Sequence, residues 1–254
     1  MANIESLPIL LKELRLGAIA KAWETLAREA TEAQWEPELY LAHLCELETA
    51  HRLENRLKRL LKESKLPTGK QLHQYQFGEV DGVTQLQIKQ KIEHLDWLRK
   101  GHNILLFGAS GLGKTHLACA IGYGLIEKSV RVKFTTSIAI TQQLQREKET
   151  LGLEDALTKL DKYELLILDD IGYVKRTDNE SQVLFELIAH RYEKGSMLIT
   201  SNQAFSEWDS IFGDNMMTVA AIDRLVHHAS IYQITGESYR KKQAIKTREQ
   251  NRPS

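Results

Sequence analysis

The chain contains 254 residues, of which 42% are hydrophobic and 27% are charged. These proportions are ordinary for a soluble globular protein and leave room for a sizeable core, so no disulfide framework is needed. The length allows one large domain, or a core with a small appendage. The 34 basic and 34 acidic residues give a net charge of zero, but they are unevenly distributed along the chain.

The two cysteines, Cys45 and Cys119, lie in apolar helical segments and are expected as buried thiols. Two cysteines cannot form a four-ligand zinc site without several histidines, and no suitable spacing occurs, so no structural metal is expected. The N-terminus lacks a basic region followed by a long apolar run, and no segment reaches about 18 uncharged apolar residues. We therefore expect a cytoplasmic protein without a membrane partner.

Residues 1–66 have a helical pattern throughout, with a break near Gly17. From Pro37, apolar residues recur at steps of three and four, which predicts one long amphipathic helix. The apolar stripe of this helix consists of Tyr40, Leu44, Leu47, Ala50, Leu53, Leu57 and Leu60. Basic residues repeat at the same steps and form a basic ridge beside the stripe: Arg52, Arg56, Arg59 and Lys62. The ridge is read either as a solvated helix face or as a DNA-binding surface.

Basic residues also gather at the C-terminal end. The tail contains Arg240, Lys241, Lys242, Lys246, Arg248 and Arg252 against one acidic residue, Glu249. The middle of the chain is therefore mildly acidic between two basic ends. This asymmetry indicates a polyanionic partner and favours the DNA-binding interpretation of the ridge.

The segment "LPTGK" at residues 66–70 breaks the helical pattern with Pro67 and Gly69, and we place a domain boundary after residue 67. Beyond it, strand-like apolar runs alternate with helical segments. The strands are expected at residues 103–107, 130–134, 165–168, 196–200 and 230–234. This alternation predicts an α/β fold with a parallel sheet covered by helices on both faces.

The segment "GASGLGKTH" at residues 108–116 has the spacing G-x-x-x-x-G-K-T between an expected strand and an expected helix. Glycines let successive backbone N–H groups turn inward as a nest for phosphate oxygens, beside the positive end of the helix dipole. Lys114 is expected to reach the β- and γ-phosphates, and Thr115 to ligate Mg²⁺. The predicted nucleoside triphosphate site comprises Gly108, Ala109, Ser110, Gly111, Leu112, Gly113, Lys114, Thr115 and His116.

A second motif, "ELLILDDIG" at residues 164–172, is an apolar strand that ends in two aspartates. Asp169 is placed to hold the Mg²⁺ shell, as a Walker B aspartate does. Asp170 is placed to polarise the attacking water, a position where many related ATPases have the longer Glu. Asn202 follows the strand in "SMLITSNQ" and is expected either to orient that water toward the γ-phosphate or to form a turn.

The segment "AAIDRLVHH" is an apolar helix that contains Arg224. This arginine either pairs with Asp223 on its own surface or stabilises the γ-phosphate charge on a neighbouring subunit. His227 and His228 occupy successive helical positions that should not face one another, so we expect them to be packing and surface residues rather than ligands. Further upstream, Trp208 and Phe212 have helical spacing and are expected in the core.

The ordered set "GASGLGKTHLACAIG", "LLILDDIG", "LITSN" and "AAIDRLVHHASIYQITGESYR" resembles the IstB-like helper ATPases of bacterial insertion sequences. These proteins are related to the DnaC helicase loader and DnaA initiator branch of the AAA+ superfamily. The resemblance covers essentially the whole chain. It implies a small all-helical N-terminal domain (1–67) for DNA, partner and oligomer contacts, a five-stranded AAA+ ATPase domain (68–239) and a basic tail (240–254).

The resemblance also implies roles for single residues. Asn202 matches the sensor I residue and Arg224 matches the arginine finger, so the implied catalytic set is Lys114, Asp170, Asn202 and Arg224. Arg240 is either a sensor II-like ATP contact or a member of the basic tail. The implied cofactors are ATP and Mg²⁺, with subunits that assemble as a homo-oligomer on double-stranded DNA.

Three functions remain open from the sequence. The first is a transposition regulator that binds ATP and DNA and stimulates a partner transposase, as the family does. The second is a DnaC-like replicative helicase loader, which shares the same core. The third is a small-molecule kinase that uses the same phosphate loop, but the basic helical N-terminal segment does not provide an acceptor pocket.

Overall fold

The computed structural model describes residues 4–172, 177–212 and 215–239. The chain divides into two compact units, Met1–Arg59 and Leu60–Ser254. The division falls within the long helix α3 (Pro37–Ser64), and not after residue 67 where the helical pattern ends. None of the described helices is long and apolar enough to cross a membrane.

The first unit contains a short 3-10 turn (Ile4–Ser6), α1 (Leu7–Glu13), α2 (Gly17–Glu32) and most of α3. Its small buried core joins the three helices through Leu11, Ile19 and Leu44. Partly buried residues pack around this core: Leu7, Leu16, Trp23, Leu26 and Tyr40. The break predicted near Gly17 is confirmed, since α2 begins at that residue.

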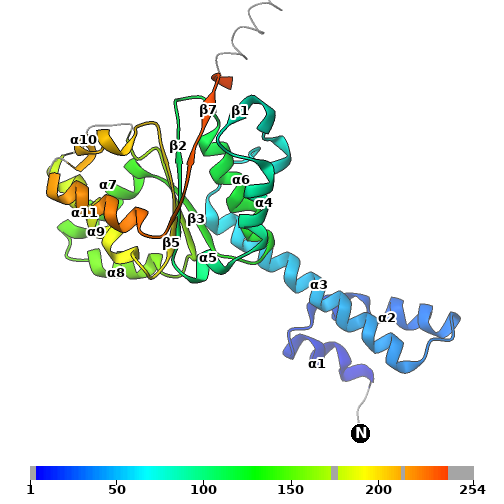
Figure 1. Ribbon diagram of the computed structural model, residues 1–254. Helices are drawn as coiled ribbons and strands as arrows, with labels where there is room; N and C mark the ends of the chain where they lie inside the picture. Colours follow the sequence, from blue (N-terminus) through cyan, green and yellow to red (C-terminus); the bar gives the residue numbers. More distant parts are fainter. Residues whose placement is uncertain (1–3, 173–176, 213–214, 240–254) are drawn as a thin grey trace, which may run out of the picture. The chain divides into compact units, whose positions relative to one another are not determined.

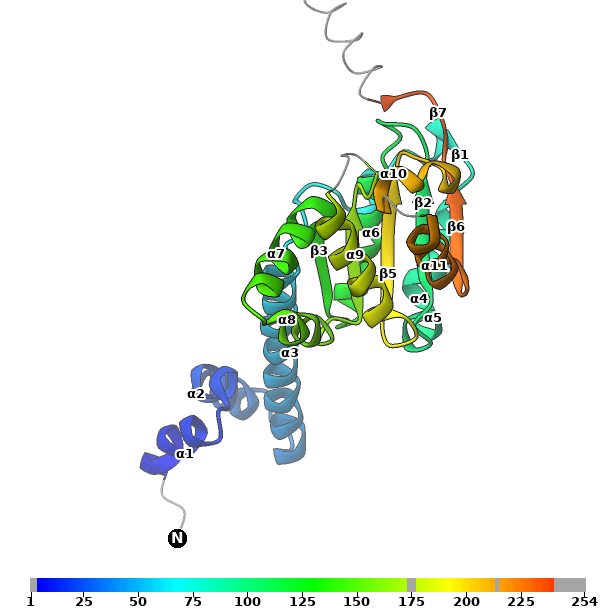
Figure 2. The same ribbon diagram turned by 90° about the vertical axis from the view of Figure 1, so that its left-hand side faces the viewer.

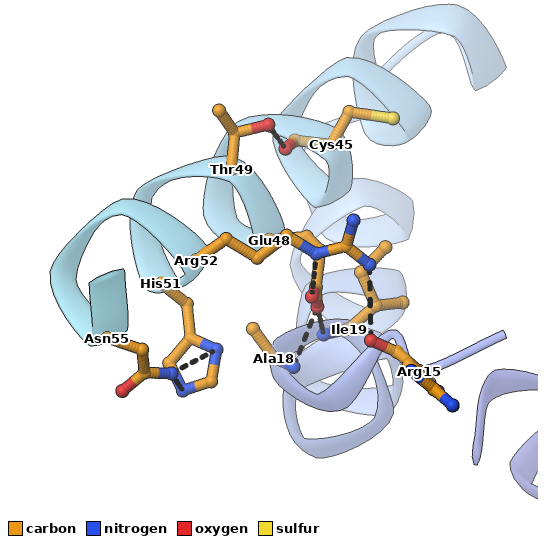
Figure 3. Close-up of polar contacts among 9 residues, drawn as sticks. All are labelled: Arg15, Ala18, Ile19, Cys45, Glu48, Thr49, His51, Arg52 and Asn55. Carbon is orange, nitrogen blue, oxygen red and sulfur yellow. Dashed lines mark hydrogen bonds and ion pairs between the residues drawn. The ribbon is translucent and has the colours of Figure 1, made fainter. Parts of the chain in front are cut away.

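A buried carboxylate in the first unit caps the start of α2 (Figure 3). Glu48 Oε2 accepts hydrogen bonds from the backbone N–H groups of Ala18 at 2.8 Å and Ile19 at 3.3 Å. These amides lie in the first turn of α2 and have no partner within the helix, and the preceding Leu16 has no side-chain oxygen to cap them. Arg52 Nε donates to Glu48 Oε1 at 2.9 Å, which joins one member of the basic ridge to the buried acid.

The apolar stripe predicted on α3 is buried only in part. Leu44 and Leu60 are buried, whereas Leu47 is 37% exposed and Leu53 is 49% exposed. Cys45 is also exposed, so the expectation of two buried thiols is wrong for it and right for Cys119. Helical spacing predicts which face of a helix is apolar, but the packing partners decide how much of that face is buried. The core formed with α1 and α2 reaches α3 around Leu44.

The second unit is built on a parallel sheet of five strands in the order β3-β4-β5-β2-β6. The strands are β2 (Asn103–Phe107), β3 (Val132–Thr136), β4 (Leu165–Asp169), β5 (Ser196–Ser201) and β6 (Ala229–Gln233). Every residue of β2, β4 and β5 is buried, as expected for parallel strands covered on both faces. The predicted strands are therefore confirmed, with β3 starting two residues later than expected and β6 one residue earlier.

Helices cover both faces of this sheet (Figure 1). One face packs against α7 (Ser137–Glu149), α8 (Leu153–Leu160), α9 (Asp178–Arg191), α10 (Asp209–Phe212) and α11 (Asn215–Val226). The other carries α4 (Gln85–Glu93), α5 (Asp96–Arg99) and α6 (Lys114–Glu127). Trp208 and Phe212 are buried in the first of these layers, which confirms their expected place in the core.

Small elements surround the end of the sheet where the strands finish. The antiparallel pair β1 (Val80–Asp81) and β7 (Thr235–Gly236) lies there, as Figure 2 shows. Three 3-10 turns complete the described elements: Leu72–Gln74, Phe77–Glu79 and Phe205–Glu207. Because β7 follows β6 directly, the pairing brings residues 75–81 to the same end of the sheet as the glycine-rich loop after β2.

Candidate functional site

The glycine-rich loop between β2 and α6 has a backbone that only glycine adopts easily. Gly108 has φ +150°, and Gly113, which precedes the first residue of α6, has φ +79°. A Cβ at Gly108 would lie 2.3 Å from the carbonyl oxygen of Ile234, and one at Gly113 would lie 2.8 Å from the ring of Tyr75. The glycines are therefore required both for the left-handed backbone and for close packing around the loop.

Lys114 is the first residue of α6 and its side chain is buried inside this loop. Its Nζ donates to the carbonyl oxygens of Gly108 at 2.7 Å and Ala109 at 3.0 Å. A buried ammonium is costly unless it is paired or hydrogen-bonded, and these carbonyls satisfy it within the protein. The ammonium thus lies within the turn where the predicted phosphate oxygens would bind.

The next residue, Thr115, connects the loop to the end of β4. Its Oγ1 donates to Asp169, at 2.8 Å from Oδ1 and 3.0 Å from Oδ2. Thr200 of β5 donates from its own Oγ1 to Asp169 Oδ1 at 2.7 Å. The predicted pair of Mg²⁺ ligands is therefore brought together, and Thr200 is a third residue of this hydrogen-bonded group that the sequence patterns did not reveal. The signal that could have found it is its place at a strand end, shortly before Asn202.

Asp170 has a strained backbone that two hydroxyl groups hold in place. Its φ is +57°, in the left-handed region that Asp tolerates better than most residues. Its N–H donates to Thr200 Oγ1 at 2.9 Å, and its carbonyl accepts from Ser137 Oγ at 2.6 Å. The left-handed backbone at Asp170 changes the direction of the chain there. The neighbouring carboxylates of Asp169 and Asp170 can therefore point to different parts of the site. Ser137, at the start of α7, was also missed.

A pocket of about 830 Å³ adjoins these residues, and its lining does not include the predicted Gly108, Ala109 and Asp169. Its lining contains the loop residues from Ser110 to His116, together with Asp170 and Asn202, as the sequence predicts. It also contains residues that sequence reasoning did not find: Gly69, Lys70, Gln74, Tyr75, Gln76, Glu79, Val80, Glu237 and Tyr239. They come from segments without a nucleotide motif. The pairing of β1 with β7 and the hydrogen bonds from Tyr75 to Leu112 and from Tyr239 to Gly111 bring these segments to the loop.

Tyr75 is the most closely packed of these additional residues. Its hydroxyl donates to the carbonyl of Leu112 at 3.2 Å, and its ring meets the ring of His116 edge to face at 5.4 Å. His116 Nε2 in turn lies 3.0 Å from the carbonyl oxygen of Gln71. Burial raises the pKa of Tyr75 to about 12, so the phenol remains a protonated hydrogen-bond donor at neutral pH. Tyr75 therefore braces the glycine-rich loop from outside.

Arg224 lies elsewhere, on α11, and is not among the described residues that line the pocket. Its Nη1 donates to the carbonyl of Ala220 at 2.8 Å, and its guanidinium lies 5.2 Å from the ring centre of Phe185. Arg224 thus contacts Ala220 and Phe185, whereas one of the two alternatives from the sequence was an ion pair with Asp223. Exposed apolar side chains adjoin it on the same helix, with Met216 at 81% and Val219 at 67% exposure.

The basic ridge on α3 is exposed at all four positions, Arg52, Arg56, Arg59 and Lys62. Arg52 also donates to Glu48, and to the carbonyl of Arg15 at 3.2 Å. Part of the positive charge of Arg52 is therefore neutralised by Glu48 within the first unit. Arg240 and the rest of the basic tail lie outside the described residues.

A glycine-rich phosphate loop, a strand-end aspartate bonded to its threonine and a five-stranded parallel sheet together define a P-loop nucleotide-binding protein. The profile of the IstB-like ATP binding protein family matches residues 9–247, and the chain belongs to that family. It is 46% identical over 98% of its length to a putative insertion sequence ATP-binding protein of Sinorhizobium fredii, covering 84% of that protein. It is 35% identical over 89% of its length to the IS5376 putative ATP-binding protein of Geobacillus stearothermophilus, covering 90% of it.

Solved structures with the same fold are more distant in sequence. The DnaC helicase loader matches with a TM-score of 0.55 at 18% identity, over 66% of this chain and 98% of that one. AMPPCP-bound DnaA from Aquifex aeolicus matches with a TM-score of 0.56 at 18% identity, over 74% of this chain and 56% of that one. At this level of identity the likeness concerns the fold alone.

Proposed function

We propose that this protein hydrolyses ATP in a Mg²⁺-dependent reaction, assembles as an oligomer on double-stranded DNA and acts there with a transposase. The observation that carries the proposal is the division of the catalytic set. Lys114, Asp170 and Asn202 border one pocket, whereas Arg224 lies on α11 outside its lining. A second subunit that places its α11 beside the pocket would complete the set.

The residues of the pocket fit ATP and Mg²⁺. The loop requires glycine at positions 108 and 113, where a Cβ would collide with Ile234 and Tyr75, and the Lys114 ammonium provides a positive charge inside the loop. The Thr115 hydroxyl and the Asp169 carboxylate are oxygen ligands of the kind that Mg²⁺ prefers, and they lie 2.8 Å apart. When bound there, Mg²⁺ would neutralise charge on the β- and γ-phosphates.

The remaining groups would act on the attacking water. Asp170 accepts a hydrogen bond from that water and so increases its nucleophilicity, while the amide of Asn202 fixes its direction relative to the γ-phosphate. Asp170 is one methylene shorter than Glu, so the water either lies closer to the strand end or is activated less strongly. Thr200 and Ser137 hold the backbone of Asp170 and thereby set the position of its carboxylate.

The names of the relatives support transposition as the context, since those proteins are described as insertion sequence ATP-binding proteins. The likeness of the fold to DnaC keeps a helicase loader as the second candidate. Neither of these two insertion sequence relatives is described as a kinase. The exposed basic ridge on α3 supplies charges for the phosphates of DNA.

A complementation experiment tests the division of the site. Arg224→Ala should bind ATP but should neither hydrolyse it nor assemble on DNA. Mixing it with Asp170→Asn should restore activity, because one of the mixed interfaces pairs an intact Asp170 with an intact Arg224. Arginine fingers contribute roughly 10³-fold or more in rate, so the rescue should be measurable. Arg99→Ala is the matched control, since Arg99 is an exposed arginine beyond α11 and the pocket.

No rescue at any mixing ratio would place Arg224 in its own site or make it structural. The partner is tested separately, by pull-down on DNA with a cognate transposase and with a replicative helicase. We expect the transposase alone to be retained with ATP, and capture of the helicase instead would overturn the transposition proposal.

A further inference from the structure

Three turns meet at the end of the sheet opposite the nucleotide pocket. They precede the neighbouring strands β5, β2 and β6, and they contain Glu193, His102, and the pair His227 and His228. Because parallel strands start at the same edge, the turns before them lie side by side, at the starts of the strands in Figure 2. The phosphate loop follows β2 and therefore belongs to the other edge.

Three side chains in these turns converge. Glu193, His227 and His228 each present one ligand atom, and these atoms all lie within 4.8 Å of one another. The two histidine rings are 4.0 Å apart between centres. The prediction that these rings do not face one another is wrong, because it assumes that the helix continues through His227 and His228. In the structure α11 ends at Val226, so helical spacing does not apply to the histidines that follow.

The backbone around the cluster is braced. The buried side chain of Asn103 donates to the carbonyl of Leu225 at 3.0 Å and accepts from the N–H of Met197 at 2.9 Å. Its own N–H donates to the carbonyl of His228 at 2.8 Å. Asn103 of β2 therefore connects the end of α11 to the start of β5. The converging histidines follow α11, and Glu193 precedes β5.

The converging side chains also have supporting contacts. Tyr192 Oη lies 3.0 Å from His227 Nδ1, a contact that orients the ring. The ring of His102 stacks on that of His228, with centres 4.9 Å apart and planes inclined by 16°. A hydrogen bond to the second nitrogen and a stacked neighbour are the kinds of contact that orient histidine ligands in metal sites.

We propose that Glu193, His227 and His228 form a site for a divalent transition metal ion of the zinc or nickel class. Two imidazoles and one carboxylate are a ligand set that such ions prefer, whereas Mg²⁺ and Ca²⁺ prefer oxygen alone. All three side chains are exposed, so an ion reaches them from solvent and water completes its coordination. The site is separate from the Mg²⁺ ligands of the nucleotide pocket and does not depend on the proposed function.

A bound ion would join the end of α11 to the turn before β5. His227 follows Arg224 by three residues, so the ion would also restrain the helix that carries the proposed arginine finger. An ion that binds the native chain alone raises its melting temperature as the ion concentration rises. This gives a readout that is independent of ATP turnover.

The test uses the untagged full-length chain without nucleotide, with Mg²⁺ in large excess so that hard oxygen sites are occupied. Zn²⁺ is titrated in competition with a chromogenic chelator. We expect one equivalent to bind and the melting temperature to rise. His227→Ala and His228→Ala should each weaken binding by about tenfold or more, and the double variant should lose the rise. His73→Ala with His94→Ala is the matched control, because both of these histidines are exposed and lie outside the cluster.

Melting without metal and ATP binding serve as checks that the variants are folded. Co²⁺ provides a second measurement, since its visible absorption reports imidazole coordination and should disappear in the double variant His227→Ala/His228→Ala. The proposal is overturned if that folded double variant binds Zn²⁺ as the unaltered chain does. It is equally overturned if the unaltered chain fails to compete with the chelator, or if the control variant loses binding to the same extent.

Discussion

Thr115 and Asp169 are separated by 54 residues, yet Thr115 Oγ1 donates a hydrogen bond to Asp169 Oδ1 at 2.8 Å. The contact joins the first turn of α6 to the last residue of β4, across β5, which lies between β4 and β2 in the sheet. Thr200 of that intervening strand reaches the same oxygen at 2.7 Å. Both hydroxyl groups therefore hold one carboxylate at the end of β4, beside the start of α6.

The first prediction separates binding from hydrolysis. Lys114→Ala should abolish stable ATP binding, because it removes a full positive charge from inside the phosphate loop. Asp170→Asn should keep binding but stop turnover, because in the proposed reaction Asp170 acts mainly on the water. Equilibrium binding of a fluorescent ATP analogue and single-turnover phosphate release measure the two steps. Normal ATP affinity in the Lys114 variant would contradict the assignment.

The second prediction concerns Thr200, which touches both aspartates of the motif. Thr200→Val keeps the shape but removes the donor to Asp169 and the acceptor for the Asp170 N–H. We expect turnover to fall by about 10- to 100-fold, with a smaller change in ATP affinity, because both carboxylates lose their orientation. Thr200→Ser retains the hydroxyl and is the control. Equal losses in the two variants would show that packing and not hydrogen bonding matters here.

The third prediction concerns DNA binding by the ridge. Arg56, Arg59 and Lys62 are the members without the Glu48 contact, so their joint reversal to Glu leaves the cap of α2 intact. Binding should weaken, and the log–log dependence on salt should flatten by about 0.9 for each phosphate that the variant no longer neutralises. Fluorescence anisotropy with duplex DNA at several salt concentrations measures both effects. A triple variant that binds DNA like the unaltered chain would make the ridge a solvated face.

The fourth prediction concerns the stability of the first unit. Glu48→Ala leaves the amides of Ala18 and Ile19 without their acceptor, and we expect a loss of about 1–3 kcal/mol in the free energy of unfolding. Hydrogen exchange of these two amides in the full-length chain should accelerate. Glu46→Ala, on the exposed side of the same helix, is the control. Unchanged exchange in Glu48→Ala would mean that water caps α2 equally well.

The same carboxylate predicts a pH dependence. Burial acts to raise the pKa of Glu48, but the hydrogen bonds from Arg52, Ala18 and Ile19 together lower it below its ordinary value of 4.5. A lowered pKa in the folded chain means that the ionised form contributes stability above pH 4.5, which is lost as the pH falls through the folded value. The difference in unfolding midpoint between the unaltered chain and Glu48→Gln should therefore shrink in acid. A constant difference would contradict the ionised cap.

Local patterns were sufficient to predict many features. The spacing of Gly108, Gly113 and Lys114 specifies a phosphate loop because a left-handed backbone and a charge are required at fixed positions along the chain. The apolar runs predicted the buried strands because parallel strands need apolar residues on both faces. Helical spacing also placed Trp208 and Phe212 in the core. Each of these features depends on neighbours within a few residues.

Tertiary structure decided the features that depend on which distant segments meet. The strand order brings Thr200 beside Asp169, and the pairing of β1 with β7 brings Tyr75 to the phosphate loop. The i, i+4 spacing of Glu48 and Arg52 is visible in the sequence, but only the tertiary structure shows that the Glu48 carboxylate also caps the start of α2. The end of α11 at Val226 turns His227 and His228 toward one another. The sequence by itself determined which chemistry each strand end carries, because that chemistry is local. Only the tertiary structure decided which of these groups share a site, because hydrogen bonds and metal ligands act over a few ångströms in space, whatever their separation along the chain.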